Sequence, residues 1–364
     1  MLRRFAPRND RSLNILSMKA AVIREYGKIS LEEVKKPELR KGYVMVRVKY
    51  ASICGSDQHI FRGEFHPRTQ LPLIPGHEFA GVVEEVGEGV TTVTPGDKVT
   101  VDPIIWCGKC AACLIGHFPA CTSLRLAGID LDGGFAEFIS VPESMVYKVP
   151  SHISDENAAL IEILSIGFHA SARAGLDAND DILIVGSGKV GNSILHAAKT
   201  ITRGKIIMAD VLDERLAVAK SAFSDIHTIN TRKADPLTFI KEVTGGKGVD
   251  IAFEAVGHEK EVEGRYNPIR LCINAIRGAG KVCVLGLSDH PSAILMKELI
   301  WKEARIIASR VSHGEFSKVI DALDRGLVNP EKMVTGILDL KDAQKGFEYL
   351  ENEPAKHLKI LLKV

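Results

Sequence analysis

Cysteines gather in one short segment, CGKCAACLIGHFPAC, which holds four of the chain's 7 cysteines: Cys107, Cys110, Cys113 and Cys121. Four thiolates on one loop can close a tetrahedron around Zn²⁺. Gly108 and Gly116 favour the tight turns that such a loop needs. The alternative, four reduced thiols in a flexible loop, would leave them exposed to oxidation. The spacing therefore predicts a structural zinc site.

A further cysteine and a histidine stand apart from this segment. Cys54, in ASICGSDQHIF, and His77, in LIPGHEFAG, each lie beside glycines near the end of a strand-like run. A side chain at such a position can point into a cleft. Taken alone, however, a buried cysteine usually serves packing, and a buried histidine is usually a satisfied core residue. Their role depends on the rest of the sequence.

A glycine-rich turn lies in the second half of the chain. Gly186, Gly188 and Gly191 form the pattern G-x-G-x-x-G directly after the apolar run DILIV and directly before a helical pattern. Gly186 permits a tight turn, Gly188 lets the backbone approach a pyrophosphate, and Gly191 lets the helix pack close to the strand. A plain strand-to-helix turn is the alternative, but this setting predicts a dinucleotide site at a helix N-terminus.

An acidic residue after the next strand-like run indicates which dinucleotide binds. Asp210 lies about 20 residues past the glycines, where a carboxylate accepts a ribose hydroxyl and repels a 2′-phosphate. NAD is therefore favoured over NADP. Arg215 could soften that preference, unless it is only a solvated helical arginine. We expect further cofactor contacts from Lys189, Val190, Val256, Leu285 and Leu287.

Two kinds of architecture are expected to hold these residues in place. At 364 residues the chain is too long for one ordinary core, so two domains are expected. Before Val149, short β-like runs such as YVMVRVKY and FAGVVEEVG are broken by Gly and Pro, which is typical of an antiparallel, barrel-like domain. SDENAALIEILSIGFHASARAG then predicts a helical stretch with Ser154 as its N-cap. From DILIV onward, strands alternate with helices, which predicts a doubly wound parallel sheet.

In this combination the motifs resemble the zinc-containing medium-chain dehydrogenases, the family of alcohol, sorbitol and threonine dehydrogenases. The pattern GHE-x2-G-x5-G-x2-V matches from Gly76 to Val90, and GD-x-V matches from Gly96 to Val99. The cysteine segment and the glycine turn stand in the family order. The resemblance covers nearly the whole chain, from Met18 to Val364.

The resemblance implies an α/β protein of two domains and places them along the chain. A GroES-like antiparallel β-barrel catalytic domain would comprise residues 18–165 and 310–364. A Rossmann NAD-binding domain with a doubly wound parallel sheet would comprise residues 166–309. Residues 1–17, MLRRFAPRNDRSLNILS, differ in character from the remainder of the chain. We expect them to be a disordered extension or a misplaced start, with a targeting peptide as the less favoured alternative.

The same resemblance assigns a catalytic zinc to a second group of residues. Cys54 and His77 would be ligands, and Glu78 would be an adjacent ligand or a nearby carboxylate. Glu162 would be the third protein ligand, either directly or through water. A zinc ion with an open position acts as a Lewis acid on a substrate alcohol, and the alcohol carbon can then pass a hydride to the nicotinamide.

The proton released from the alcohol needs a path to solvent. Ser56 resembles the relay hydroxyl of the family, although a turn hydroxyl bonded to its own backbone is the alternative. His59 either continues this relay or is only a surface residue, and the sequence favours neither interpretation.

The alcohol itself is less sharply defined. Glutamate at position 162 sides with the polyol dehydrogenases, whereas Ile60 stands where sorbitol dehydrogenases usually have tyrosine. The segment IIASRVSHGEF around Arg310 is similar to sugar-acid dehydrogenases such as the L-galactonate oxidoreductase group. The resemblance therefore implies an NAD- and zinc-dependent dehydrogenase of a secondary alcohol in a polyol or sugar acid. Arg310 would anchor that substrate, or else pack structurally or bind cofactor.

Two other functions stay open. An L-threonine-type amino-alcohol dehydrogenase would use the same zinc chemistry. A dinucleotide- or zinc-binding module without turnover should have lost a ligand, yet Cys54, His77 and Glu162 are all present.

Charge and hydropathy restrict the partners. The net charge is +1 with scattered Lys and Arg, so nucleic acid is not an expected partner. Neither a signal-peptide run nor an uncharged apolar stretch of about 18 residues is present, so we expect a cytoplasmic protein away from membranes. In that compartment clustered cysteines more often hold metal than pair. By resemblance we expect a small-molecule alcohol substrate and a homo-oligomer, dimer or tetramer, joined through sheet edges. Packing roles are expected for Cys272, Cys283 and His169.

Overall fold

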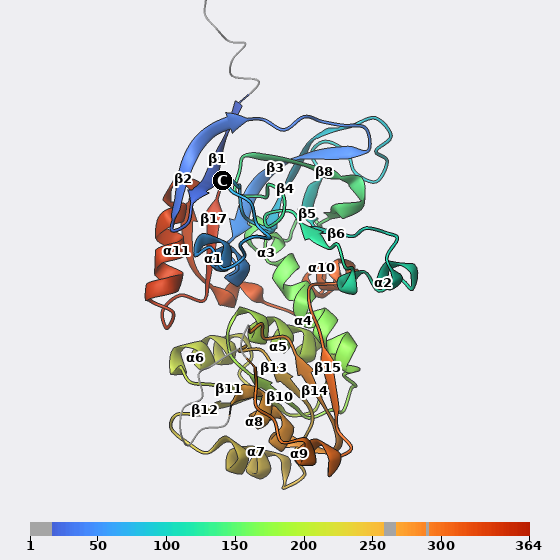
Figure 1. Cartoon of the computed structure of the whole chain (residues 1–364), viewed down its shortest axis with the longest axis vertical. Helices are drawn as coiled ribbons and strands as arrows, with labels where there is room; N and C mark the ends of the chain where they lie inside the picture. The colour runs from blue at the N-terminus through green and yellow to red at the C-terminus, as the bar shows by residue number, and fades with distance from the viewer. Residues whose placement is uncertain (1–16, 258–266, 289–290) are drawn as a thin grey trace, which may run out of the picture.

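The computed structural model describes residues 17–257, 267–288 and 291–364. Figure 1 shows two parts stacked along the long axis, one holding the first and last segments of the chain and the other holding the segment between them. Their different sheets confirm the predicted two-domain α/β class. Of the expected N-terminal extension, residues 1–16 lie outside the described residues, and Ser17 begins the first strand.

The first part is a mainly antiparallel β domain. Its strands are β1 (Ser17–Glu25), β2 (Lys28–Lys35), β3 (Tyr43–Ser52), β4 (Glu78–Val86), β5 (Lys98–Val101), β6 (Ile104–Ile105), β7 (Arg125–Leu126), β8 (Phe138–Pro142), β9 (Val146–Lys148), β16 (Val334–Asp339) and β17 (Lys359–Lys363). A 7-stranded sheet has the order β16-β17-β3-β4-β5-β9, with β8 also paired to β3. Its pairs are antiparallel except β16 with β17, which are parallel because a helix, not a hairpin, connects them.

The second part is a doubly wound domain around a 6-stranded parallel sheet of order β12-β11-β10-β13-β14-β15. Its strands are β10 (Ile182–Val185), β11 (Ile206–Asp210), β12 (His227–Asn230), β13 (Val249–Glu254), β14 (Ile276–Val284) and β15 (Arg305–Ala308). All residues of β10 are buried, because apolar clusters cover both faces of the sheet. This confirms the predicted Rossmann-like sheet.

Helices complete both parts. They are α1 (Gly55–Phe61), α2 (Ala111–Leu114), α3 (Asp155–Ala158), α4 (Ile161–Ala174), α5 (Lys189–Ile201), α6 (Asp213–Ala222), α7 (Pro236–Thr244), α8 (Pro268–Ala275), α9 (Met296–Ile300), α10 (Phe316–Asp324) and α11 (Ala343–Asn352), with 3₁₀ turns η2 (Phe118–Ala120), η3 (Glu143–Met145), η4 (Pro330–Met333) and η5 (Leu340–Asp342). In the described parts of the chain, no helix has the length and apolar character needed to cross a membrane.

The two parts meet at α4, which Figure 1 places between them. The helical stretch expected after Ser154 is in fact two helices, because the chain turns at Ala159 and Leu160 between α3 and α4. Ser154 caps α3 as predicted, accepting a hydrogen bond from the N–H of Asn157. The predicted domain boundary at residues 165 and 166 falls inside α4, so it stays a prediction rather than a visible break in the chain.

Candidate active site and metal centres

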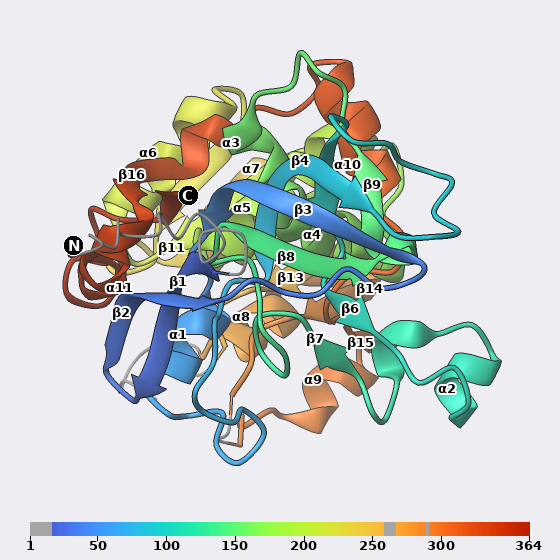
Figure 2. The same cartoon turned by 90° about the horizontal axis from the view of Figure 1, so that it is seen from above.

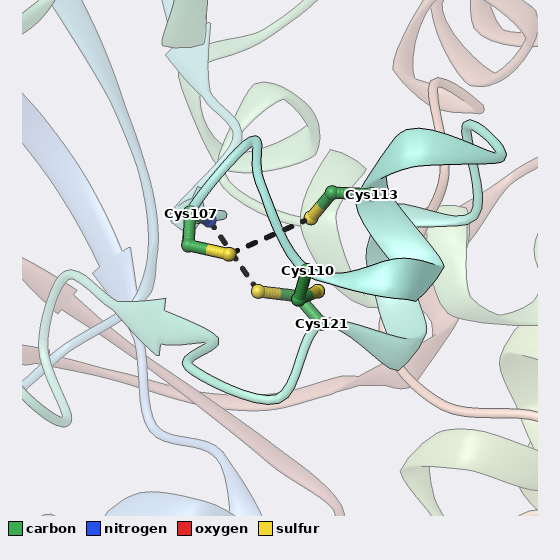
Figure 3. Close-up of side chains that lie close together, drawn as sticks. All are labelled: Cys107, Cys110, Cys113 and Cys121. Carbon is green, nitrogen blue, oxygen red and sulfur yellow. Dashed lines mark hydrogen bonds between the residues drawn. The ribbon is translucent and has the colours of Figure 1, made fainter.

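The cysteine segment folds into a lobe that projects from the first part, around α2 (Figures 1 and 2). Figure 3 shows the four side chains turned toward one point. Their sulfurs lie within 4.8 Å of one another, and Sγ of Cys107 is 4.0 Å from Sγ of Cys113. Zn–S bonds of about 2.3 Å in a tetrahedron separate sulfurs by about 3.8 Å. The donor set therefore fits a structural zinc ion.

The local backbone supports this arrangement. Gly108 and Gly116 adopt φ angles of +72° and +75°, which a residue with a Cβ rarely adopts. Backbone N–H groups of Cys113 and Thr122 bond to the Cys110 sulfur and lower its pKa to about 5, which favours the thiolate that a metal needs. The chain's cysteines are all free thiols, so no disulfide competes for these sulfurs.

A second donor cluster joins Cys54, His77 and Glu78, whose ligand atoms also lie within 4.8 Å of one another. Cys54 precedes α1, and Glu78 begins β4 directly after His77. Asp57 ties the two segments together: its carboxylate accepts the N–H of Cys54 at 2.8 Å and that of Gly76 at 3.3 Å. It also lies 3.5 Å from Nδ1 of His77. The buried Asp57 thus orients both donors.

Two glutamates compete for the role of third ligand. Glu78 is fully buried and forms a short ion pair with the fully buried Lys359, while its Oε1 has no hydrogen-bond partner. Glu162, on α4, lies outside the tight cluster but lines the same cavity, and its buried Oε2 is also unpartnered. Burial, with the charge of Glu78 adding to it, raises the pKa of Glu162 to about 8. Unpartnered carboxylate oxygens around Cys54 and His77 fit a divalent cation.

One cavity of about 680 Å³ brings the two parts of the molecule together. Its walls contain most of the predicted catalytic, metal, cofactor and substrate residues: Cys54, Ser56, His59, His77, Glu162, Gly188, Lys189, Val190, Arg215, Val256, Leu285, Leu287 and Arg310. Glu78 is not among the lining residues. His59 is part-exposed and forms a short contact with Glu64, which connects it to the surface.

The glycine turn has the close approaches that its pattern predicts. Gly186 has φ +101°, and a Cβ on Gly191 would lie 1.7 Å from the carbonyl oxygen of Gly186. Gly188 caps α5, and a Cβ there would meet no atom of the described residues within 4 Å. The turn therefore leaves an open surface at a helix N-terminus, where a phosphate group can approach the backbone.

A second cavity of about 500 Å³ continues from this turn toward the end of β11 and shares Gly188, Arg215 and Val256 with the first. Asp210 lines it, and its carboxylate accepts N–H bonds from Ser187, Val211 and Leu212 at 2.6–2.9 Å. Arg232 and Lys233 also line this cavity, so the acid is not the only charge near the expected ribose.

Lys189 is a cation that approaches the metal cluster from the nucleotide side. Its Nζ donates to the carbonyl of Ile53, the residue before Cys54, at 3.2 Å. Burial, and then the charge of Lys359, lower the pKa of Lys189 to about 8.

Several residues of the site were not identified from the sequence. Asp57 stands in the CGSD stretch beside Cys54, so its spacing could have drawn attention to it. Lys359 is a lysine in the apolar strand β17, and a charge in such a run signals a buried partner. Arg68 and Phe65 line the cavity from a loop with no motif. His169, expected only to pack, is buried and pairs through Nδ1 with Glu315 at 3.1 Å.

Comparison with known proteins agrees with this geometry. The alcohol dehydrogenase GroES-like domain matches residues 40–151, and the zinc-binding dehydrogenase domain matches residues 190–325. The sorbitol dehydrogenase of Bacillus subtilis is 33% identical over 338 residues, 91% of this chain and 93% of that protein. An L-threonine 3-dehydrogenase of Bacillus velezensis is 32% identical over 326 residues, 88% of this chain and 92% of that protein.

A solved structure extends the similarity to three dimensions. The crystal structure of the alcohol dehydrogenase RspB from Escherichia coli CFT073, complexed with NADH, has a TM-score of 0.86 and 32% identity. It covers 96% of this chain and 99% of that one. Since both domains match and relatives above 30% identity span almost the full length, the chain belongs to the zinc-containing medium-chain dehydrogenases, a family of oxidoreductases.

Proposed function

We propose that the protein catalyses the reversible NAD-dependent oxidation of a secondary alcohol, in a polyol or sugar acid, to a ketone. One observation carries the proposal: Cys54, His77 and Glu162 share a cavity with Gly188 of the nucleotide turn. A metal centre and a dinucleotide site on one cavity are what hydride transfer from an alcohol requires.

The proposed metal centre uses Cys54 and His77 together with one of the two glutamates. Zinc bound there would supply Lewis-acid chemistry that makes a substrate hydroxyl more acidic. Glu78 is already paired with Lys359, whereas Glu162 faces the cavity with an unpartnered oxygen. We therefore assign Glu162 as the third protein ligand of the zinc. Glu78 would stay in its ion pair with Lys359 beside the metal centre.

In the proposed proton path, the hydroxyl of Ser56 accepts the substrate proton and His59 passes it to solvent. Both residues line the cavity, and His59 reaches the surface beside Glu64. The apolar side chains of Val256, Leu285 and Leu287 would exclude water from the nicotinamide.

The preference for NAD over NADP rests on Asp210. Three backbone N–H groups hold its carboxylate at the end of β11, so a negative charge is positioned where a 2′-phosphate would lie. The same cavity is also lined by three positively charged residues, which would attract a 2′-phosphate: Arg215, Arg232 and Lys233. We propose that the preference for NAD is real but moderate.

The test combines metal analysis with turnover. We expect about two zinc ions per chain, one at each donor cluster. NAD⁺ should be reduced with polyols or sugar acids more efficiently than NADP⁺, and a chelator that removes the cavity zinc should abolish this activity. The Cys54→Ser variant should lose one zinc and the activity together, whereas a variant of the buried Cys272, which lines neither cavity, should lose neither.

The same panel separates the alternatives. Preferred turnover of L-threonine would favour an amino-alcohol dehydrogenase, which the 32% identical relative also supports. One zinc per chain and no turnover of any alcohol would contradict an enzyme and favour a binding module with only the cysteine site.

We also propose that the protein is a homo-oligomer. β15 ends the parallel sheet, and exposed apolar side chains gather beside it on α9 and at Trp301, which is 78% exposed. An unpaired apolar strand edge is a natural site for a second copy.

A further inference from the structure

An arginine without an ion-pair partner among the described residues stands in the wall of the proposed active-site cavity. Arg310 follows the end of β15, lines the cavity and remains exposed to solvent. Within the described residues it takes part in no ion pair, and no hydrogen bond holds its guanidinium. Burial, and then the neighbouring charge of Arg68, lower the pKa of Arg310. The charge of the Cys121 thiol acts in the opposite direction on this pKa, but no carboxylate among the described residues pairs with the Arg310 guanidinium.

The second arginine comes from the loop between α1 and β4. Nε and Nη2 of Arg68 donate to the two carboxylate oxygens of Asp130 at 2.9 and 2.7 Å. Asp130 is in turn held by the N–H of Leu126, at 2.9 Å. The guanidinium also lies 5.9 Å from the ring of Phe65, which stacks on His59. Arg68 is thus fixed in the cavity wall but remains 40% exposed.

The backbone beside Arg310 is strained. Val311 has φ +48°, although it is a β-branched residue and not a glycine. Such a conformation costs about 1–3 kcal/mol and persists only where the surrounding structure imposes it. Val311 lines the same cavity, so the strain lies where Arg310 leaves the strand and turns into the site.

The side chains around Arg68 and Arg310 carry more positive than negative charge. Arg68 is neutralised by Asp130, but Arg310 has no carboxylate of its own among the described residues, and Glu162, which lines the same cavity, is assigned above to the proposed metal centre. Leu126, Ile129 and Phe65 also line the cavity and offer no anion. Two guanidinium groups with one surplus positive charge match a ligand oxyanion, which accepts bidentate, charge-assisted hydrogen bonds.

We propose that Arg68 and Arg310 form an anion subsite, so that the enzyme selects alcohols that carry a carboxylate or a phosphate group remote from the oxidised carbon. This inference rests on the proposed function and narrows its substrate class. It assigns a role in substrate specificity to Arg68, whose guanidinium Asp130 holds in place. A neutral polyol would leave the surplus charge of Arg310 unpaired and should bind more weakly.

The test compares substrates that share a carbon skeleton: gluconate, sorbitol 6-phosphate and sorbitol. Wild-type enzyme should show lower KM values for the anions than for sorbitol, and the preferred anion identifies carboxylate or phosphate as the natural group. In Arg310→Gln and Arg68→Gln, KM for the preferred anion should rise roughly 10- to 100-fold. The fold-increase in KM for the anion should be about ten times the fold-increase in KM for sorbitol. The fold-decrease in kcat should be smaller than the fold-increase in KM for the anion.

Two matched variants sharpen the result. Arg325→Gln removes an exposed arginine paired with Asp321 on α10, away from the cavity, and should alter none of these values. Asp130→Asn removes the carboxylate that fixes Arg68 and should raise KM for the anion more than KM for sorbitol. Equal losses for anionic and neutral substrates in Arg310→Gln, or a wild-type preference for sorbitol, would overturn the subsite.

Direct binding separates this proposal from the proposed function. Gluconate and inorganic phosphate are titrated by calorimetry into the zinc-loaded protein with NADH bound. Binding that Arg310→Gln abolishes supports the subsite even if no alcohol is oxidised. Absence of anion binding contradicts the subsite, including in a protein that turns over neutral polyols.

Discussion

At the scale of single residues, buried charges outside the active site make stability depend on pH. Asp102, just after β5, is 7% exposed and accepts one hydrogen bond, from the N–H of Ile104, at 3.1 Å. Burial raises its pKa from 3.8 to about 7. The folded state therefore holds this proton more tightly than the unfolded state. The stability that the proton confers is complete below about pH 3.8 and is lost as the pH rises through 7.

Replacing Asp102 with Asn should remove this pH dependence. The amide keeps the acceptor for Ile104 and carries no charge, so the variant should be more stable than wild type above pH 7. The gain is on the order of 4 kcal/mol and should shrink as the pH falls toward about 5. Thermal unfolding at about pH 5 and about pH 8.5, on either side of the raised pKa, measures it. Asp97→Asn, which removes a part-exposed carboxylate paired with Lys148, should give no gain at the higher pH. An equal effect of Asp102→Asn at both pH values would contradict this prediction.

At the scale of elements, two glycines of the turn from β10 to α5 differ in what surrounds them. A Cβ at position 191 would collide with the backbone of Gly186, whereas a Cβ at position 188 meets no described atom within 4 Å. Gly188→Ala should therefore fold normally, yet place a methyl group where a pyrophosphate would approach. NADH affinity should fall by about tenfold or more.

Fluorescence titration of NADH measures this loss, and thermal unfolding without cofactor checks the fold. Gly278→Ala is the matched control, because Gly278 is equally open but lies on β14 outside both cavities. If Gly188→Ala bound NADH as wild type does, the turn would not be the pyrophosphate site.

At the scale of the whole molecule, two exposed apolar surfaces could hold a second copy. One lies beside the sheet edge at β15, where Ile300 and Trp301 are 67% and 78% exposed. The other is the tip of the cysteine lobe, where Leu114 and Ile115 are 74% and 81% exposed. The first adjoins the strand that ends the parallel sheet of the described residues, and free N–H and C=O groups of such a strand can extend the sheet into a partner.

The double variant Ile300→Glu, Trp301→Glu should therefore reduce the oligomer, because charged side chains at a buried apolar interface cost several kcal/mol. Analytical ultracentrifugation measures the mass in solution. The control Leu114→Glu, Ile115→Glu should leave the mass unchanged. If the control were a monomer and the Ile300→Glu, Trp301→Glu variant were not, the interface would lie at the cysteine lobe and not at β15.

Local patterns in the sequence were enough for the parts of the fold that depend on neighbours in the chain. The glycine turn, the alternating strands and helices after Ile182 and the β-rich first part all follow from periodicity and turn residues, and the two-domain class is confirmed. The split between α3 and α4 was missed, because both pieces have helical periodicity and only packing decides where the chain turns. The parallel pairing of β16 with β17 was missed for a similar reason.

The candidate donors and their order could thus be identified from the residues alone: the cysteine segment, Cys54, His77, Glu162 and the dinucleotide turn. Which of these groups meet, and through which partners, depends on the packed chain. Packing placed Asp57 against Cys54 and His77, paired Glu78 with Lys359 across more than half of the chain, and brought the charge of Arg68 near Arg310. The physical reason is that such contacts depend on how separate elements pack, and no spacing along the chain encodes the distance between side chains on different elements.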